Sequence, residues 1–101
     1  MRHLATPQEL IRAVGDRAKD RRLALGRTQE ATAAGAGVSR ATLVRFEQTG
    51  EARFDVIVRI AFALDAQDAF AALFPPVDLR TLDEVLTAAR PQRRRVRTKR
   101  A

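Results

Sequence analysis

Apolar residues near the start of the chain recur at the spacing of one helix face, because positions three or four apart lie on the same side of an α-helix. The residues that follow this pattern are Leu10, Ile11, Val14, Ala18 and Leu25. The preceding segment Thr6-Pro7-Gln8-Glu9 combines a capping box with proline at the first helical position, and this combination is a strong helix start. The pattern therefore predicts a helix that begins at Pro7 and ends at Gly26.

Two short helices joined by a tight turn are predicted next, over residues 29–34 and 40–48. Thr28 and Ser39 stand immediately before them, and both are good N-cap residues. The segment Gly35-Ala36-Gly37 supplies a glycine that can adopt a positive φ and end the first of the two helices.

The second of these helices has an inward and an outward face. Leu43 and Phe46 are three residues apart and direct one apolar stripe toward the core. The residues that remain outward are Arg40, Ala41, Thr42, Val44 and Arg45. Such a face offers hydrogen-bond donors for base edges and a small apolar group for a thymine methyl. This is the chemistry of a helix that lies in the major groove of DNA.

The stretch from Phe54 to Leu64 is almost continuously apolar. Its β-branched residues allow a short buried strand, but its length and the helical spacing of its apolar residues favour a core helix. A second short helix is expected over residues 67–74, ended by two prolines. Four of the five phenylalanines lie in this region, at Phe54, Phe62, Phe70 and Phe74. Such rings are more often core than contact surface, yet an exposed remainder would suit a two-fold dimer.

The C-terminal part begins with another capping box, Thr81-Leu82-Asp83-Glu84, which predicts a helix to about Ala89. Pro91 should end it, and the run RRRVRTKR has no apolar residues to bury, so we expect a basic arm that is disordered when free. The expected organisation is a domain over residues 1–74, a proline break and short helix over 75–89, and the arm over 90–101.

Length, composition and charge limit the kind of protein that this chain can be. A chain of 101 residues is large enough for one helical core. It has no cysteine, and it shows neither an apolar run of ~18 residues nor a signal peptide, so we expect a soluble, cytoplasmic protein. All twelve acidic residues and twelve of the nineteen basic residues precede Arg90, and the seven basic residues that remain account for the net charge of +7. The arm therefore carries the whole excess charge.

The segment from Thr28 to Gly50 resembles the helix-turn-helix of the Cro/phage-repressor (XRE) family. The residues that match the pattern of that family are Thr28, Gln29, Glu30, Ala33, Ala36, Gly37, Val38, Ser39, Thr42 and Glu47. The resemblance implies an all-α fold, in which a five-helix domain of the repressor type is followed by a short additional helix and the basic arm. Arg27 and Thr32 depart from the pattern, because the family usually has core leucines there.

The resemblance also implies roles for single residues. Gln29 and the amides that open its helix resemble a phosphate clamp, which positions the protein without reading sequence. Arg22 and Glu47 occupy positions where the family often has an ion pair between the first and third helices; two unrelated surface charges are the alternative. The predicted DNA-contacting set is Gln29, Ser39, Arg40, Ala41, Thr42, Val44 and Arg45, with Arg40 and Arg45 favoured for base contact.

Nothing in the sequence supports catalysis, a cofactor or a metal ion. His3 is the only histidine, and no cluster has the spacing of metal ligands. The segment Gly35-Ala36-Gly37 lacks the Lys-Ser/Thr that follows a phosphate loop.

The implied function is sequence-specific binding of double-stranded DNA, as a homodimeric repressor on a palindromic operator, in the cytoplasm and associated with the nucleoid. The Pro-Pro break and Arg-rich end are similar to the antitoxins paired with HipA-type kinase toxins (HipB-like antitoxins), so a toxin is a further expected partner. A repressor without a toxin, or a protein-interaction module on this scaffold, is the alternative. The arm residues Arg93, Arg94, Arg95, Arg97, Lys99 and Arg100 fit phosphate contacts, an acidic protein partner or a solubilising tail.

Overall fold

The computed structural model describes residues 5–93 of the chain. Six helices follow one another in this part: α1 (Pro7–Ala24), α2 (Gln29–Ala36), α3 (Arg40–Thr49), α4 (Phe54–Ala63), α5 (Asp68–Ala71) and α6 (Leu79–Arg93). No strand occurs between residues 5 and 93. The all-α fold class is therefore confirmed, and the apolar stretch from Phe54 to Leu64 forms a helix rather than a strand.

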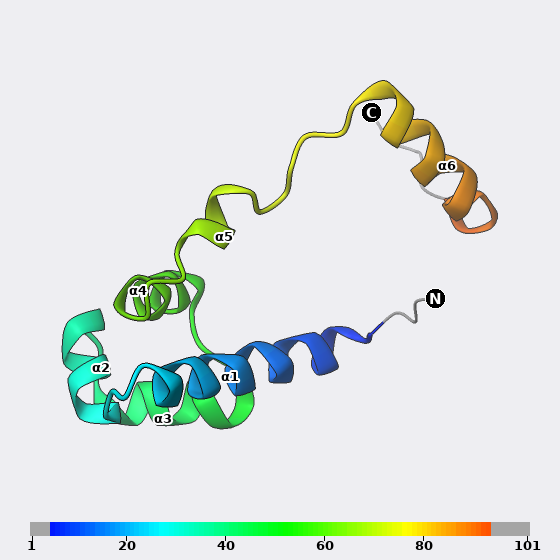
Figure 1. Cartoon of the computed structure of the whole chain (residues 1–101). Coiled ribbons are helices and arrows are strands. Elements are labelled where there is room, and N and C mark those ends of the chain that lie inside the picture. Colours follow the sequence, from blue (N-terminus) through cyan, green and yellow to red (C-terminus); the bar gives the residue numbers. More distant parts are fainter. Residues whose placement is uncertain (1–4, 94–101) are drawn as a thin grey trace.

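The first four helices form the body of the molecule. Helix α1 lies alongside α3, and α2 packs against both α3 and α4 (Figure 1). The core contains six buried residues: Ala33, Ala36, Leu43, Phe46, Ile60 and Leu64. All of them come from α2, α3, and α4 or its C-cap, so the turn between α2 and α3 is held from both sides by apolar contacts.

Local signals in the sequence explain where the helices begin and end. The Thr6 hydroxyl accepts a hydrogen bond from the Glu9 amide, and the Glu9 carboxylate accepts one from the Thr6 amide, so α1 begins with the expected capping box. Helix α2 runs two residues further than expected, because Gly37 and not Gly35 adopts the left-handed conformation, with φ 70°. Helix α3 ends one residue later than expected, at Thr49, and its C-cap Gly50 has φ 80°.

Helices α5 and α6 differ more from the expectation. Helix α5 has only four residues, and Phe74 before the prolines has φ 58°. Helix α6 begins at Leu79 rather than after Thr81, because the Asp78 carbonyl already accepts the first helical hydrogen bond, from the Leu82 amide at 2.8 Å. Asp is as good an N-cap as Thr.

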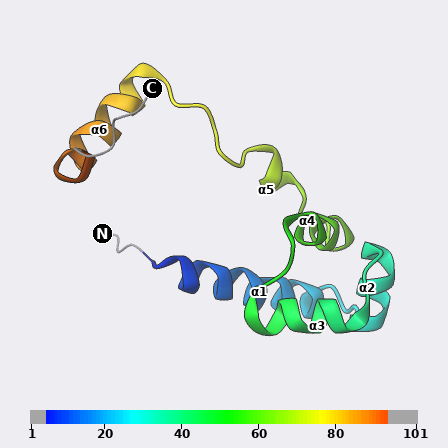
Figure 2. The ribbon, with the colours of Figure 1, turned by 180° about the vertical axis from the view of Figure 1, so that it is seen from behind.

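The predicted end of α6 was also wrong. The helix continues past Pro91 to Arg93, although a proline inside a helix removes an amide donor and disfavours its continuation. Residues 90–93, assigned to the arm from the sequence, are therefore helical. In both views α6 stands clear of the four-helix body (Figure 1, Figure 2).

The core interpretation of the four phenylalanines was wrong. Phe54, Phe62 and Phe74 are 59, 60 and 89% exposed, and Phe70 is half-buried, with its ring edge against Phe54 at a centroid distance of 5.8 Å. Phe46 is the one phenylalanine of the described residues that is buried. The exposure of Phe54 and Phe62 shows that no other described helix covers these two rings of α4.

The two departures from the family pattern have different consequences. Thr32 is buried and its hydroxyl has no hydrogen-bond partner among the described residues. Arg27 instead reaches across to α4, where its guanidinium donates to the Ala63 carbonyl and pairs with Asp65 at 3.3 Å. Arg21 adds hydrogen bonds to the carbonyls of Leu64 and Asp65. Two cations thus cap the C-terminal end of α4, where the helix dipole favours positive charge.

A close approach of two glycines sets the distance between α1 and α3. A Cβ atom at Gly15 of α1 would lie 2.4 Å from the Phe46 carbonyl oxygen, and one at Gly50 would lie 2.0 Å from the Ile11 carbonyl oxygen. Both obstacles are backbone atoms, which cannot rotate away as a side chain can. Any side chain at Gly15 must therefore push α1 and α3 apart.

This packing predicts opposite effects of two glycine substitutions. Gly15→Ala should lower the free energy of unfolding by at least about 1–3 kcal/mol, since it overpacks a helix contact. Gly35→Ala should raise it by about 0.5 kcal/mol, because Gly35 lies inside α2 and its Cβ would make only ordinary contact with Ala63, at 3.9 Å. Urea denaturation of both variants checks the pair. A Gly15→Ala protein as stable as the original would contradict the assigned contact.

Candidate nucleic-acid interface

Helices α2 and α3 form the turn that presents the candidate interface. The Thr28 hydroxyl accepts a hydrogen bond from the Ala31 amide at 3.0 Å, and the Ser39 hydroxyl accepts one from the Thr42 amide at the same distance. Each helix therefore begins with a side-chain cap and with further amides that point outward. Such N-termini carry partial positive charge and suit phosphate oxygens.

The outward face of α3 carries four exposed side chains: Arg40, Ala41, Arg45 and Gln48. Ala41, Arg45 and Gln48 recur at intervals of four and three residues and so form one stripe along the helix, and Arg40 stands beside Ala41 at its N-terminal end. Val44 and Thr42 are half-buried at its edges, and the Thr42 hydroxyl accepts a hydrogen bond from Ser39 at 2.8 Å.

Gln48 was missed in the sequence analysis. Its distance of three residues from Arg45 was the available signal, because that spacing places both side chains on one face of a helix. Glutamine binds adenine with two hydrogen bonds, as arginine does guanine. The stripe therefore combines the two side-chain types most suited to reading purines in a major groove.

Arg45 is engaged by an acidic neighbour. Its Nη2 atom lies 2.6 Å from Oε1 of Glu51, and both side chains are largely exposed. Exposed ion pairs contribute little to stability, so this pair can open at small cost. Glu51 thus orients Arg45 in the free protein without withholding it from a stronger acceptor.

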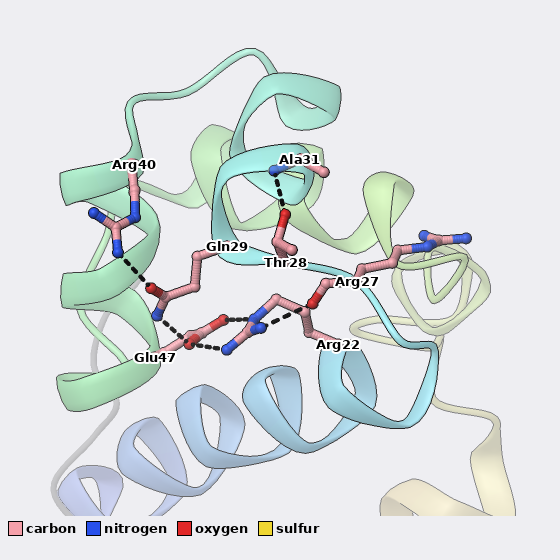
Figure 3. Close-up of polar contacts among 7 residues, drawn as sticks. All are labelled: Arg22, Arg27, Thr28, Gln29, Ala31, Arg40 and Glu47. Carbon is pink, nitrogen blue, oxygen red and sulfur yellow. Dashed lines mark hydrogen bonds and ion pairs between the residues drawn. The ribbon is translucent and has the colours of Figure 1, made fainter.

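A buried ion pair underlies this face. Arg22 of α1 and Glu47 of α3 are joined by two hydrogen bonds, from Nε to Oε2 at 2.6 Å and from Nη2 to Oε1 at 3.1 Å. Their side chains are only 8 and 2% exposed. The third donor of Arg22, Nη1, is bound to the Arg27 carbonyl at 2.9 Å. Arg22 and Glu47, which the resemblance paired, are therefore in contact. All three nitrogens of the Arg22 guanidinium donate a hydrogen bond (Figure 3).

Gln29 connects the buried pair to the surface. Its Nε2 donates to Glu47 Oε1 at 3.1 Å, and its Oε1 accepts from Arg40 Nη2 at 3.3 Å. The amide has one possible orientation here, because a carboxylate can only accept and a guanidinium can only donate. Figure 3 shows the resulting line of contacts from Arg22 through Glu47 and Gln29 to Arg40. The sequence analysis gave Gln29 only a phosphate contact and missed this second role.

The ion pair also sets the charge state of Glu47. Burial would raise the pKa of the carboxyl, but the hydrogen bonds from Arg22 and Gln29 and the charge of Arg22 outweigh burial and hold the pKa below its usual value of 4.5. Glu47 therefore stays ionised throughout the neutral range. The network needs this charge, since both neighbours donate to it.

Five basic residues of the predicted arm and the one histidine are not described by the structure. Arg94, Arg95, Arg97, Lys99 and Arg100 lie beyond the described residues, as does His3. Among residues 5–93 no group of three or more histidines or carboxylates could hold a metal ion, and no described helix is both long and apolar enough to cross a membrane.

The fold and this face together define a DNA-binding helix-turn-helix protein. The family model described as helix-turn-helix matches residues 19–66, which include the end of α1 and all of α2, α3 and α4. The matched residues form a helix-turn-helix of the XRE (Cro/phage-repressor) type, and this domain supports a DNA-binding regulator of that type. Among curated proteins, none matches the chain significantly.

The buried pair predicts a pH-dependent stability. The folded-state pKa of Glu47 is lowered, so its contribution is fully present above the ordinary pKa and is lost as the pH falls through the folded-state pKa. Glu47→Gln should lower the free energy of unfolding at pH 7 by about 3–5 kcal/mol, because it leaves the Arg22 charge buried without its partner.

The difference in the free energy of unfolding between the two proteins should narrow as the pH falls below the ordinary pKa of 4.5, because the original chain then also loses the charge of Glu47 as the pH passes its lowered folded-state pKa. Denaturant titrations between pH 3 and 7 measure it. Asp16→Asn is the matched control, since Asp16 pairs with Arg12 on the surface at 3.7 Å. If Glu47→Gln lowers the free energy of unfolding no more than Asp16→Asn does, the buried pair does not stabilise the fold.

Proposed function

We propose that the protein is a repressor that binds a palindromic operator as a homodimer. The observation that carries this proposal is the exposed stripe of Arg40, Ala41, Arg45 and Gln48 on a helix whose opposite face is fixed by the core and by the Arg22–Glu47 pair. A rigid helix with guanidinium and amide groups in line offers several donors to base edges at once.

We infer a homodimer because one such helix can contact only a short stretch of DNA. A single helix-turn-helix contacts only a few base pairs, and dimers of this class bind two half-sites about 34–36 Å apart, or at a multiple of that distance. A chain that excludes polymerase from a promoter needs this added length of recognition. The proposed role is non-enzymatic and places the protein on DNA in the cytoplasm.

Arg45 provides the sharpest test of base reading. Duplexes selected from a random library by the full chain define the preferred sequence, and affinities for single-base variants follow. Arg45→Ala should remove the preference at one base pair of each half-site, at a cost of about 1–3 kcal/mol per contact. Arg53→Ala is the matched control, because Arg53 is an exposed arginine outside α3 that also pairs with a carboxylate, Asp55.

The comparison between DNA sequences decides the outcome. Loss of affinity confined to the preferred sequence supports base contact by Arg45. An equal loss on preferred and random duplexes would show that Arg45 contacts phosphate only. Absence of any selected sequence would overturn the regulator itself.

We further propose that the basic arm adds phosphate contacts. Deleting residues 94–101 removes five of the basic residues and leaves α6 in place. Each phosphate contact contributes ~0.9 to the slope of log affinity against log salt, so the slope should flatten by about 2–4. Preferred and random duplexes should weaken equally. An unchanged slope would assign the arm to a protein partner or to solubility.

An antitoxin is the second candidate function. It is favoured by α6, which lies beyond Pro75 and Pro76, stands clear of the DNA-binding helices (Figure 1) and carries exposed apolar side chains. A HipA-type kinase encoded beside this chain should then form a stable complex with it and be inhibited. A neighbouring kinase that neither binds nor loses activity would exclude the role.

A further inference from the structure

The side of the body away from the outward stripe of α3 is an open apolar groove of about 680 Å³. Its walls are formed by Ile11 and Val14 of α1, Phe54 and Ile57 of α4, and Phe70 and Leu73 at α5. Its floor includes the buried side chains of Phe46 and Ile60. Of the apolar stripe of α1 expected from the sequence, Ile11, Val14 and Ala18 therefore line this groove, and Ile11 and Val14 remain exposed.

Helix α6 carries a second uncovered apolar face. Leu79, Leu82, Val85 and Leu86 recur at helical spacing, and all four are exposed. Such a stripe on a helix needs a partner surface to be stable in water. The described part of the chain thus contains an open apolar groove between helices and an amphipathic helix that lies in no groove.

The groove and the apolar face of α6 also carry opposite charges. Arg17 lies on the groove wall and forms no ion pair with any described residue. Asp83 stands four residues after Leu79, so it flanks the apolar stripe of α6, and it too is unpaired within residues 5–93. An α6 helix seated in the groove can bring these two charges together while it buries the leucines.

The path of the chain favours a groove on another molecule. Residues 75–78 form neither a turn nor a helix, and they lead directly into α6. Pro75 and Pro76 each fix φ, and Pro76 also restricts Pro75 to extended conformations, which opposes a reversal of the chain after Phe74, whose own φ is 58°. Both views show α6 well away from the body of its own chain (Figure 1, Figure 2).

We propose that α6 of each chain occupies the α1–α4 groove of a second copy, so that two chains exchange these helices around a two-fold axis. The inference rests on the homodimer of the proposed function and names its interface. Arg40, Arg45 and Gln48 do not line the groove, so the exchange leaves the outward stripe of α3 free for DNA.

Cysteine cross-linking tests the exchange directly, because the chain has no cysteine of its own. Ala69→Cys places a thiol in the groove, and Val85→Cys places one on the apolar stripe of α6. The two single variants, carrying tags of different size, are mixed and oxidised. The expected product is a covalent heterodimer on a non-reducing gel. Thr87→Cys, on the other side of α6, is the matched control and should not cross-link to the groove.

Two results would overturn the proposal. A chain carrying both Ala69→Cys and Val85→Cys that cross-links only within itself would show that α6 folds back onto its own groove. Absence of the heterodimer, with a dimer still seen by analytical ultracentrifugation, would place the interface elsewhere, and a monomer at all concentrations would exclude any exchange.

A second variant separates this interface from DNA binding. Leu82→Asp combined with Leu86→Asp alters exposed residues outside the core, so the body should fold, and the dimer dissociation constant should rise at least tenfold. Affinity for a single half-site should persist while affinity for the full palindrome falls. If the original chain binds no selected DNA, the proposed function fails, whereas the cross-linking result still decides the exchange.

Discussion

The buried pair of Arg22 and Glu47 is the interaction on which the arrangement of the other helices depends. Taking two charges out of water costs several kcal/mol for each, and the cost is recovered only where further hydrogen bonds satisfy the remaining donors and acceptors. This pair meets that condition, because Arg22 also donates to the Arg27 carbonyl and Glu47 also accepts from Gln29. One contact therefore ties α1, the α1–α2 connection, α2 and α3 to each other.

What this pair adds is orientation more than stability. Apolar residues of similar volume often stabilise a core equally well, but they do not select one rotation of a helix. Glu47 sits next to Phe46 on α3, and it can meet Arg22 only when Arg45 and Gln48 point outward. The close approach at Gly15 and Gly50 fixes the distance between the same two helices. The rotation of α3 about its own axis and its distance from α1 are therefore set by different contacts.

The sequence predicted best what is decided locally. Thr6, Thr28 and Ser39 cap helices as expected, and the left-handed glycines follow from chemistry within a few residues. It predicted poorly what depends on the neighbour: an apolar spacing shows that Phe54 and Phe62 share a helix, but not whether another helix covers them. The role of Gln29 between Glu47 and Arg40 depends on three helices and has no local signal.

The small size of the core links the apolar groove to the reading of DNA. Ala33 and Ala36 make up a third of the buried core residues, so they bury little area, and the exposed groove adds nothing to the stability of an isolated chain. In the proposed exchange, the apolar surface that is exposed in the monomer becomes buried between two chains. Its burial holds the two α3 helices in one dimer. Binding of one half-site then raises the effective concentration of the second α3 at the other half-site. Operator occupancy consequently rises more steeply with protein concentration than one helix alone would allow, because dimerisation and DNA binding stabilise the same species.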